Sequence, residues 1–179
     1  MDIEKKVWEV LLSEKEIEGR INELGQQISA DYQEKKLLVV SLLKGSFVFT
    51  ADLVRKISIP VKIEFMTTSS YGHGQESSGQ INIISDVKGD LTGYDVLVVD
   101  DITDSGLTMK YVMEHLKSKK PNSVKCCVLL DKPERRQIEI VPDYLGFTIP
   151  DKFVVGYGLN YGDYYRNIPY VFVVTDQDR

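Results

Sequence analysis

Three carboxylates stand close together near the middle of the chain. Asp100 and Asp101 follow the apolar run 96–99, and Asp104 lies three residues later in a polar stretch that ends at Thr108. Four apolar β-forming residues predict a strand that is covered on both faces, as in a parallel α/β sheet. Ligands of such sheets bind outside the carboxyl ends of the strands. We therefore expect the chemistry of this chain in the loop that begins with Asp100 and Asp101.

This loop combines two kinds of ligand group. The small, hydroxyl-rich residues 103–106 let backbone N–H groups converge, and the helix predicted after them adds the positive end of its dipole, so this part can cradle a phosphate. The carboxylates of Asp100 and Asp101 can accept hydrogen bonds from sugar hydroxyls or hold Mg²⁺ through water. A phosphorylated sugar would satisfy both. The alternative is a capped helix with surface acids, which is the usual meaning of an isolated Asp-Asp pair.

The segment 96–108 closely resembles the phosphoribosyl pyrophosphate signature of the type I phosphoribosyltransferases. In that signature an apolar strand precedes two acidic residues, two variable residues and Asp-Ser/Thr-Gly-x-Thr. The resemblance implies that Asp100 and Asp101 hold the ribose 2′ and 3′ hydroxyls and a metal ion. It also implies that the following loop wraps the 5′-phosphate, with the residues Asp104, Ser105, Gly106, Leu107 and Thr108.

A second loop, Lys44-Gly45-Ser46, follows the apolar strand predicted over 37–43. Backbone amides at the end of that strand could meet an anion beside the phosphate cradle. The loop resembles the one that contacts pyrophosphate through a strained peptide bond in purine phosphoribosyltransferases, which implies this role for Lys44 and Gly45. A simple helix N-cap at Ser46 is the alternative.

Lys132 follows the predicted strand 124–130, which places it on the same edge of the sheet as Asp100 and Asp104. An ammonium group there could bind a carbonyl oxygen. In the purine enzymes the lysine at this position is hydrogen-bonded to the 6-oxygen of the base, and it distinguishes 6-oxopurines from adenine. A solvated surface lysine is the alternative.

The segment 149–161 resembles the purine-binding stretch of the hypoxanthine-guanine phosphoribosyltransferases. The resemblance implies that Phe153 stacks on the purine ring, that Val154 offers backbone bonds to the base edge, and that Arg166 reaches pyrophosphate. Without the resemblance, Phe153 and Val154 would be core residues and Arg166 a surface cation.

Asn160 departs from the family pattern, because many members carry an aspartate there that binds the pyrophosphate-bound Mg²⁺. Asparagine keeps an oxygen but loses the charge, so we expect position 160 to be a weak metal ligand beside Asp100 and Asp101. A backbone contact from Asn160 to the base would remain.

The polar segment 68–79 has no means of burying itself, and we expect it to be a mobile lid. Ser70 and Tyr71 match the serine-tyrosine pair of the family's flexible loop, whose closure would exclude water from the reaction. The two histidines, His73 and His115, form no credible histidine triad or zinc site, and we expect neither to take part in the chemistry.

The resemblance as a whole implies Mg²⁺-dependent transfer of a phosphoribosyl group from phosphoribosyl pyrophosphate to hypoxanthine or guanine, with Asp104 accepting the proton from purine N7. Displacing pyrophosphate builds positive charge on the ribose ring, so catalysis requires a held leaving group and a placed nucleophile. One alternative is a receiver-type phosphoacceptor domain, although the acidic pair of a receiver belongs to its first strand. Another is a non-catalytic regulator with the same fold.

The surrounding elements are predicted from hydrophobic period and capping. Ser13 and Glu16 have the form of a capping box, and apolar residues then recur at helical spacing to about residue 31. A helix is also expected over 47–56, and further strands over 61–67 and 80–86. After the central loop, one face of another helix is expected to carry Met109, Val112, Met113 and Leu116. Strands and helices therefore alternate through the middle of the chain.

We expect a single phosphoribosyltransferase domain over residues 1–179, because the chain is long enough for one well-packed core and short for two. The implied α/β fold is that of the type I phosphoribosyltransferases, a central, mainly parallel sheet flanked by helices. Its core spans about 14–130, and a small C-terminal hood spans about 131–179 with the N-terminal segment. The lid is a flexible loop.

Composition restricts the partners. A net charge of −5 and a pI near 5.1 argue against nucleic acid, since neutralising phosphates requires clustered Lys and Arg. No apolar run reaches the roughly 18 residues needed to span a membrane, and the charged segment 1–6 favours a cytoplasmic protein. Small-molecule substrates are expected, and the family suggests a homodimer or homotetramer. Cys126 and Cys127 are adjacent on a predicted strand and are expected to pack on opposite faces.

Overall fold

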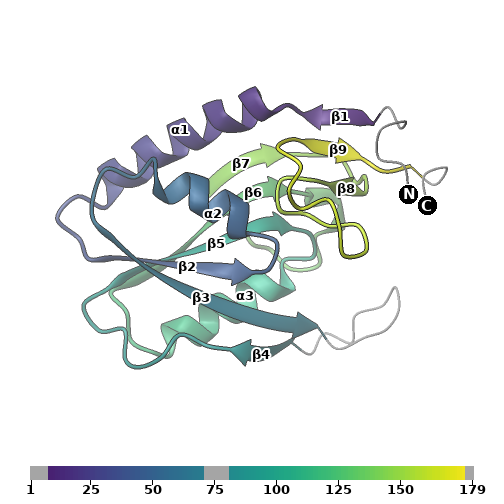
Figure 1. Ribbon diagram of the computed structural model, residues 1–179. Helices are drawn as coiled ribbons and strands as arrows, with labels where there is room; N and C mark the ends of the chain where they lie inside the picture. Colours follow the sequence, from purple (N-terminus) through teal and green to yellow (C-terminus); the bar gives the residue numbers. More distant parts are fainter. Residues whose placement is uncertain (1–7, 71–80, 176–179) are drawn as a thin grey trace.

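A six-stranded sheet forms the centre of the molecule in the computed structural model, which describes residues 8–70 and 81–175. The strand order is β4-β3-β2-β5-β6-β7, and every neighbouring pair is parallel except β3 with β4. Figure 1 shows the parallel strands pointing toward the same side of the molecule. The strands are β2 (Leu37–Leu43), β3 (Val61–Ser70), β4 (Ile81–Ser85), β5 (Asp95–Thr103), β6 (Ser123–Asp131) and β7 (Tyr144–Thr148).

Helices cover both faces of this sheet. Helices α1 (Glu14–Asp31) and α2 (Phe47–Val54) lie on one face, and α3 (Leu107–Lys117) lies on the other (Figure 1). The predicted capping box at the start of α1 is confirmed: the Glu16 N–H donates to the Ser13 hydroxyl at 3.3 Å, and the Ser13 N–H donates to the Glu16 carboxylate at 2.8 Å. Two backbone donors at the helix start are thereby satisfied.

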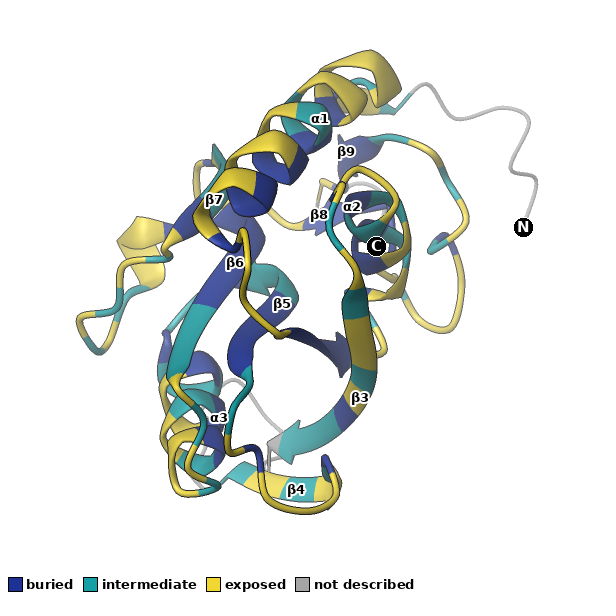
Figure 2. Ribbon diagram, turned by 90° about the vertical axis from the view of Figure 1, so that its left-hand side faces the viewer, coloured by how far each residue is buried: buried dark blue, intermediate teal, exposed yellow. Residues whose placement is uncertain are grey.

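Alternating side chains of the sheet supply two hydrophobic cores. Val39 and Val99 pack with α1 and α2, whereas Val40 and Val98 pack with α3. The continuous apolar runs of β2 and β5 are therefore explained by burial of both faces, as Figure 2 shows for the central strands. The cysteines follow the same alternation as predicted, with Cys127 in the first core and Cys126 in the second.

A smaller sheet joins the two ends of the described chain. Its order is β1-β9-β8, with β1 (Glu9–Leu12) and β8 (Val154–Val155) both antiparallel to β9 (Val171–Val173). It lies on the side toward which the parallel strands point (Figure 1). A short 3₁₀ helix, η2 (Pro133–Arg135), follows β6. No helix in the described part of the chain is long and apolar enough to cross a membrane.

Two expectations about the sheet were wrong. Asp100 and Asp101 do not stand in a loop, because β5 continues pairing with β6 as far as Thr103, which lies opposite Asp131. Residues 144–148 do not belong to a hood, because they form the edge strand β7, parallel to β6. In both cases pairing with a distant strand extends the sheet beyond the local apolar run.

Smaller differences concern the ends of elements. Strand β3 runs to residue 70, so that residues 68–70 of the expected lid are strand, and residues 71–79 lie outside the described residues. Strand β4 is one residue shorter than predicted at each end, β6 is one residue longer at each end, and α2 ends at Val54, not at 56.

Candidate active site

The strand order reverses direction between β2 and β5. The chain passes from β2 to β3 on one side, and then returns to place β5 on the other side of β2. The loops after β2 and β5 therefore diverge, which opens a crevice outside the carboxyl ends of these neighbouring strands. Lys44 and Gly45 follow β2, and Asp100 and Asp101 stand near the end of β5. The fold thus brings together two loops that the sequence singled out separately.

Gly45 lies directly against Asp101. A Cβ atom built on Gly45 would stand 1.8 Å from the Asp101 Oδ2 atom, so a larger residue at this position would have to displace the Asp101 carboxylate. The Leu43–Lys44 peptide bond is cis. Ser46 stands at the N-cap position of α2, as the alternative supposed, but its hydroxyl donates to the Leu42 carbonyl at 2.6 Å and makes no capping bond.

The carboxylates of Asp100 and Asp101 form a close, partly buried pair. Backbone donors hold both: the Asp101 N–H donates to Asp100 Oδ1 at 3.0 Å and the Ile102 N–H to Asp101 Oδ1 at 2.9 Å. Burial and the neighbouring Asp101 charge raise the pKa of Asp100 well above its ordinary value. Burial also raises the pKa of Asp101, although hydrogen bonds and the charge of Arg166 oppose that rise. Hydroxyl donors or a cation would relieve this concentration of negative charge.

The predicted phosphate cradle lies at the beginning of α3. Gly106 adopts a left-handed conformation, with φ of +84°, immediately before the first residue of the helix. The Leu107 N–H donates to the Ser105 hydroxyl at 3.3 Å. The first N–H groups of a helix have no partner within the helix, so Thr108 and its neighbours present donors to an anion. This geometry suits the 5′-phosphate that the sequence predicted here.

Asp104 and Lys132 meet at the same edge of the sheet. Lys132 Nζ lies 3.9 Å from Asp104 Oδ1 and 4.0 Å from Asp151 Oδ1. Lys132 is only 5% exposed, which excludes the alternative of a solvated surface lysine. The Oδ1 atom of Asp104 is shielded from solvent and accepts no hydrogen bond from the described residues. Asp104 therefore offers, near Lys132, an acceptor atom that is not used in a hydrogen bond with the described residues.

The C-terminal segment supplies an aromatic wall. Phe153 is 38% exposed, and its ring meets that of Tyr161 edge to face with 5.9 Å between centroids. The next residue, Val154, is buried in β8 and fixes the backbone beside that ring. Asn160 is exposed, and its side-chain amide donates to the carbonyl of Gly162.

Arg166 belongs to the same segment and is linked to the crevice. Its Nη1 atom donates to the Gly158 carbonyl at 2.6 Å, and the Gly158 N–H donates to the Arg166 carbonyl at 2.9 Å. A Cβ built on Gly158 would stand 2.2 Å from the Gly45 carbonyl oxygen, so this segment touches the loop after β2. Arg166 is thereby placed near the loop expected to hold pyrophosphate.

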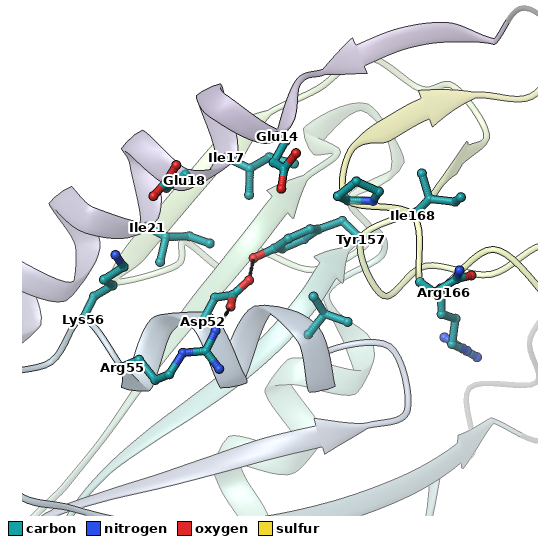
Figure 3. A pocket seen from close by; sticks show the side chains of 13 residues that line it. Glu14, Ile17, Glu18, Ile21, Asp52, Arg55, Lys56, Tyr157, Arg166 and Ile168 are labelled. Carbon is teal, nitrogen blue, oxygen red and sulfur yellow. Dashed lines mark hydrogen bonds and ion pairs between the residues drawn. The ribbon is translucent and has the colours of Figure 1, made fainter.

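A cavity of about 460 Å³ lies beside the crevice, between α1, α2 and the C-terminal segment. The Tyr157 hydroxyl donates to Asp52 Oδ2 at 2.5 Å across it (Figure 3). Arg166 lies at its rim with the guanidinium directed away from Asp52 and Tyr157. Asp100, Asp101 and Asp104 do not line this cavity, and Arg166 is the one predicted site residue among those that do.

Protein ligands for a metal ion are few. No group of three or more His, Cys, Asp or Glu side chains in residues 8–70 and 81–175 could hold one. The paired carboxylates of Asp100 and Asp101 offer oxygen ligands of the kind that Mg²⁺ takes, and Mg²⁺ typically combines one or two carboxylates with water and substrate phosphates. The residues therefore fit a magnesium ion that is shared with a phosphorylated substrate.

Ser70, Tyr71 and the two histidines are the remaining residues that the sequence analysis discussed. Tyr71 and His73 lie outside the described residues, and of Ser70 only the backbone is described, as the end of β3. His115 lies on α3, where its Nε2 atom is 2.8 Å from Asp86 Oδ2. That contact lies between the helix and the segment after β4.

Sequence reasoning missed several side chains that support the site. Arg136 contacts both Asp131 and the backbone of Asp104, and Tyr157 joins the C-terminal segment to Asp52. Only Tyr157 had a local signal in the sequence, the glycines on both sides of it; in the structure all three residues have positive φ, which is +50° for Tyr157. A single arginine in a polar segment carries no such signal.

Known proteins resemble this chain over nearly its whole length. Residues 7–162 match the family model described as a phosphoribosyl transferase domain. Hypoxanthine-guanine phosphoribosyltransferase from Aquifex aeolicus is 49% identical over 98% of this chain and 99% of its own length. Hypoxanthine phosphoribosyltransferase from Haemophilus influenzae is 50% identical over 91% of this chain and 93% of its own. The crystal structure of a hypoxanthine phosphoribosyltransferase from Staphylococcus aureus superimposes with a TM-score of 0.90, at 46% identity, covering 94% of this chain and 92% of that one.

Proposed function

Because this chain belongs to the phosphoribosyltransferase family, and within it to the hypoxanthine-guanine enzymes, we propose that it is a purine-salvage transferase. The reaction moves the 5-phosphoribosyl group from phosphoribosyl pyrophosphate to N9 of hypoxanthine or guanine, and it releases pyrophosphate with IMP or GMP. Family membership removes the receiver-type alternative. The non-catalytic regulator is disfavoured because Asp104 and Lys132 are both retained.

One observation supports the proposal most strongly. The Oδ1 atom of Asp104 is shielded from solvent, accepts no hydrogen bond from the described residues and lies 3.9 Å from the Nζ atom of Lys132, at the carboxyl ends of β5 and β6. A group that must accept a proton during attack needs a free oxygen beside the nucleophile. A group that must recognise a 6-oxopurine needs a fixed donor. Asp104 provides the proton acceptor and Lys132 the donor, and the two groups are close enough to contact the same purine ring.

The phosphoribosyl group is assigned to the β5 strand end and the loop after it. Asp100 and Asp101 accept hydrogen bonds from the ribose hydroxyls, and backbone donors of 104–108 hold the 5′-phosphate. Magnesium, when bound, neutralises charge on the leaving pyrophosphate. Backbone groups of Lys44 and Gly45 hold that pyrophosphate together with Arg166, so the leaving group is clamped without any covalent intermediate.

The purine is assigned to the space between Lys132 and the C-terminal wall. Phe153 stacks on its ring, Val154 and the backbone at Asn160 bond to its edge, and Lys132 donates to the 6-oxygen. Asn160 would be a weaker ligand of a pyrophosphate-bound Mg²⁺ than an aspartate, because its amide oxygen carries no charge. Ser70 and Tyr71 are assigned to the lid, whose closure excludes water from the ribose carbon.

Steady-state assays of hypoxanthine, guanine, xanthine and adenine with phosphoribosyl pyrophosphate and Mg²⁺ test this proposal directly. We expect IMP and GMP as products, with no comparable product from adenine, and loss of activity when EDTA removes the metal. Binding of phosphoribosyl pyrophosphate without nucleotide formation from any base would identify the chain as a regulator instead.

We also propose that the chain assembles as a homodimer or homotetramer in the cytoplasm. Ile63, Phe65 and Ile84 leave apolar surface exposed on the neighbouring strands β3 and β4, and such surface commonly marks an interface. Light scattering after gel filtration measures the assembly, and a monomer of 20.4 kDa at micromolar concentration would contradict it.

A further inference from the structure

The segment after β6 lies against the loop that carries Asp104. The Lys132 N–H donates to the Thr103 carbonyl at 3.0 Å, and the Gln137 N–H donates to the Ser105 carbonyl at 3.0 Å. A Cβ built on Gly106 would stand 2.7 Å from the side chain of Ile140. The segment that supplies the crevice lysine is therefore bonded to the Asp104 loop on both sides of Asp104.

Arg136 connects these two segments through its side chain. Its Nη1 atom donates to the Asp104 carbonyl oxygen at 2.9 Å, and its Nη2 atom bonds the Asp131 carboxylate. The side chains of Arg136 and Asp131 are only 16% and 11% exposed, so water competes little for these bonds. Asp131 is the last residue of β6 and immediately precedes Lys132. One guanidinium thus spans from the end of β6 to the backbone of Asp104.

The contacts of Asp104 explain why this connection matters. Its Oδ1 atom accepts no hydrogen bond from the described residues, and the nearest cation, Lys132 Nζ, is 3.9 Å away. The direction of the carboxylate therefore depends on its backbone, and Arg136 bonds that backbone directly. A displacement of about 1 Å in a reacting group costs on the order of 10²-fold in rate.

We propose that Arg136 is a positioning residue for the transfer reaction. It fixes the position of the Asp104 carboxylate relative to Lys132. The carboxylate that accepts the proton and the ammonium that recognises the base can then contact the same purine. Arg136 bonds the Asp104 carbonyl and the Asp131 carboxylate, and it therefore acts through Asp104. The inference rests on the proposed function, and its test separates the two.

The chain offers a matched control in Arg20. This arginine also donates to backbone carbonyls, at 2.7 and 3.1 Å to Leu145 and at 3.2 Å to Gly146, but these belong to the edge strand β7. Replacing it removes similar hydrogen bonds without touching the Asp104 loop. Arg20→Met therefore reports the stability cost alone.

The test measures kcat, the KM of both substrates and the melting temperature for Arg136→Met, Arg136→Lys and Arg20→Met in the full chain. We expect Arg136→Met to lower kcat by roughly 10- to 10²-fold and Arg20→Met to change it by less than about twofold, with comparable losses of melting temperature. Arg136→Lys should be intermediate in kcat, because a single ammonium lacks the fork that reaches both acceptors. If Arg136→Met fails to fold, the kcat of Arg136→Lys provides the test instead.

A double variant then separates positioning from general weakening. If Arg136 acts through Asp104, adding Arg136→Met to Asp104→Asn should lower kcat by less than about twofold further. A full additional loss in that background, or equal kcat in Arg136→Met and Arg20→Met, overturns the inference. An unmodified chain that forms no nucleotide overturns the proposed function instead, so the two failures are distinct.

Discussion

Gly45 and Asp101 are in contact across the crevice between β2 and β5: a Cβ on Gly45 would lie 1.8 Å from Oδ2 and 2.6 Å from Cγ of Asp101. Gly45 follows β2, Asp101 lies near the end of β5, and the two strands are parallel neighbours. The loop assigned to pyrophosphate and the acid assigned to ribose are therefore mutually dependent. The absence of a side chain at position 45 is what allows both to occupy the crevice.

Gly45→Ala should displace the Asp101 carboxylate and lower kcat/KM for phosphoribosyl pyrophosphate by roughly 10²-fold, the cost typical of misplacing a reacting group by about 1 Å. Gly19→Ala is the matched control, because nothing lies within 4 Å of the added Cβ on α1. That control should leave the kinetics unchanged and stabilise the helix by about 0.5–1 kcal/mol. Unimpaired turnover in Gly45→Ala would contradict the assignment of this loop.

Asp104→Asn should lower kcat by roughly 10²-fold or more, because the amide cannot accept the purine proton. The fold should survive, since the free Oδ1 atom makes no hydrogen bond within the described residues that the substitution would break. Glu114→Gln is the control, because it removes the charge of an exposed carboxylate on α3. Rates within a few-fold of the unmodified enzyme in Asp104→Asn would refute its role as the base.

Lys132→Ala should chiefly impair the use of hypoxanthine and guanine. A lost charge-assisted hydrogen bond corresponds to roughly 10- to 10²-fold in kcat/KM for the base. The KM for phosphoribosyl pyrophosphate should change little. Lys110→Ala, which removes an exposed lysine of α3, is the control, and unchanged discrimination against adenine in Lys132→Ala would count against the assignment.

Local sequence patterns predicted the central elements well. The capping box and helical spacing placed α1 at its observed bounds, and the apolar run 37–43 is β2 without change. These signals are local because a buried strand or an amphipathic helix must carry its own apolar residues. The continuation of β5 to Thr103 had no such signal, since three of its last four residues are polar and this part is held in the sheet by pairing with β6.

The same reasoning explains which candidate site residues could be named from the sequence. Asp100, Asp101 and Asp104 share one short segment, so their spacing alone is enough to predict a site. Arg136 meets the Asp104 backbone from 32 residues away, and the Tyr157 hydroxyl meets Asp52 from 105 residues away. Contacts of this kind depend on how strands and loops pack in the tertiary structure, and local patterns in a single sequence do not predict that packing.

Asp86 links the segment after β4 to α3 and should make stability sensitive to acid. Burial by itself would raise the pKa of Asp86, but hydrogen bonds from Lys119 and His115 outweigh it and lower that pKa. In acid, below the ordinary aspartate pKa of about 4, the unfolded chain gains a proton that the folded protein still resists. Stability from this group is therefore present at neutral pH and lost as the pH falls through that range.

Asp86→Asn should consequently reduce the melting temperature at pH 7 and narrow the difference in melting temperature between pH 7 and pH 3. Asp163→Asn, at an exposed position, should leave both quantities close to those of the unmodified protein. An Asp86→Asn variant that retains the full acid dependence would show that other carboxylates are responsible.

Asp100→Asn should increase stability while it lowers activity. Burial and the adjacent Asp101 charge raise the pKa of Asp100 well above its unfolded value, so the ionised carboxylate destabilises the free protein at neutral pH. Asparagine removes that charge and keeps an oxygen for the Asp101 N–H, which now donates to Oδ1 at 3.0 Å. The free energy of unfolding should rise by about 1 kcal/mol at pH 7, a common size for relieving strain at a functional site. Below the unfolded pKa both forms of the residue are neutral, so the gain should vanish in acid. Urea unfolding at pH 7 and pH 3 measures this difference. A loss of stability at pH 7 in Asp100→Asn would show that the ionised Asp100 does not destabilise the free protein.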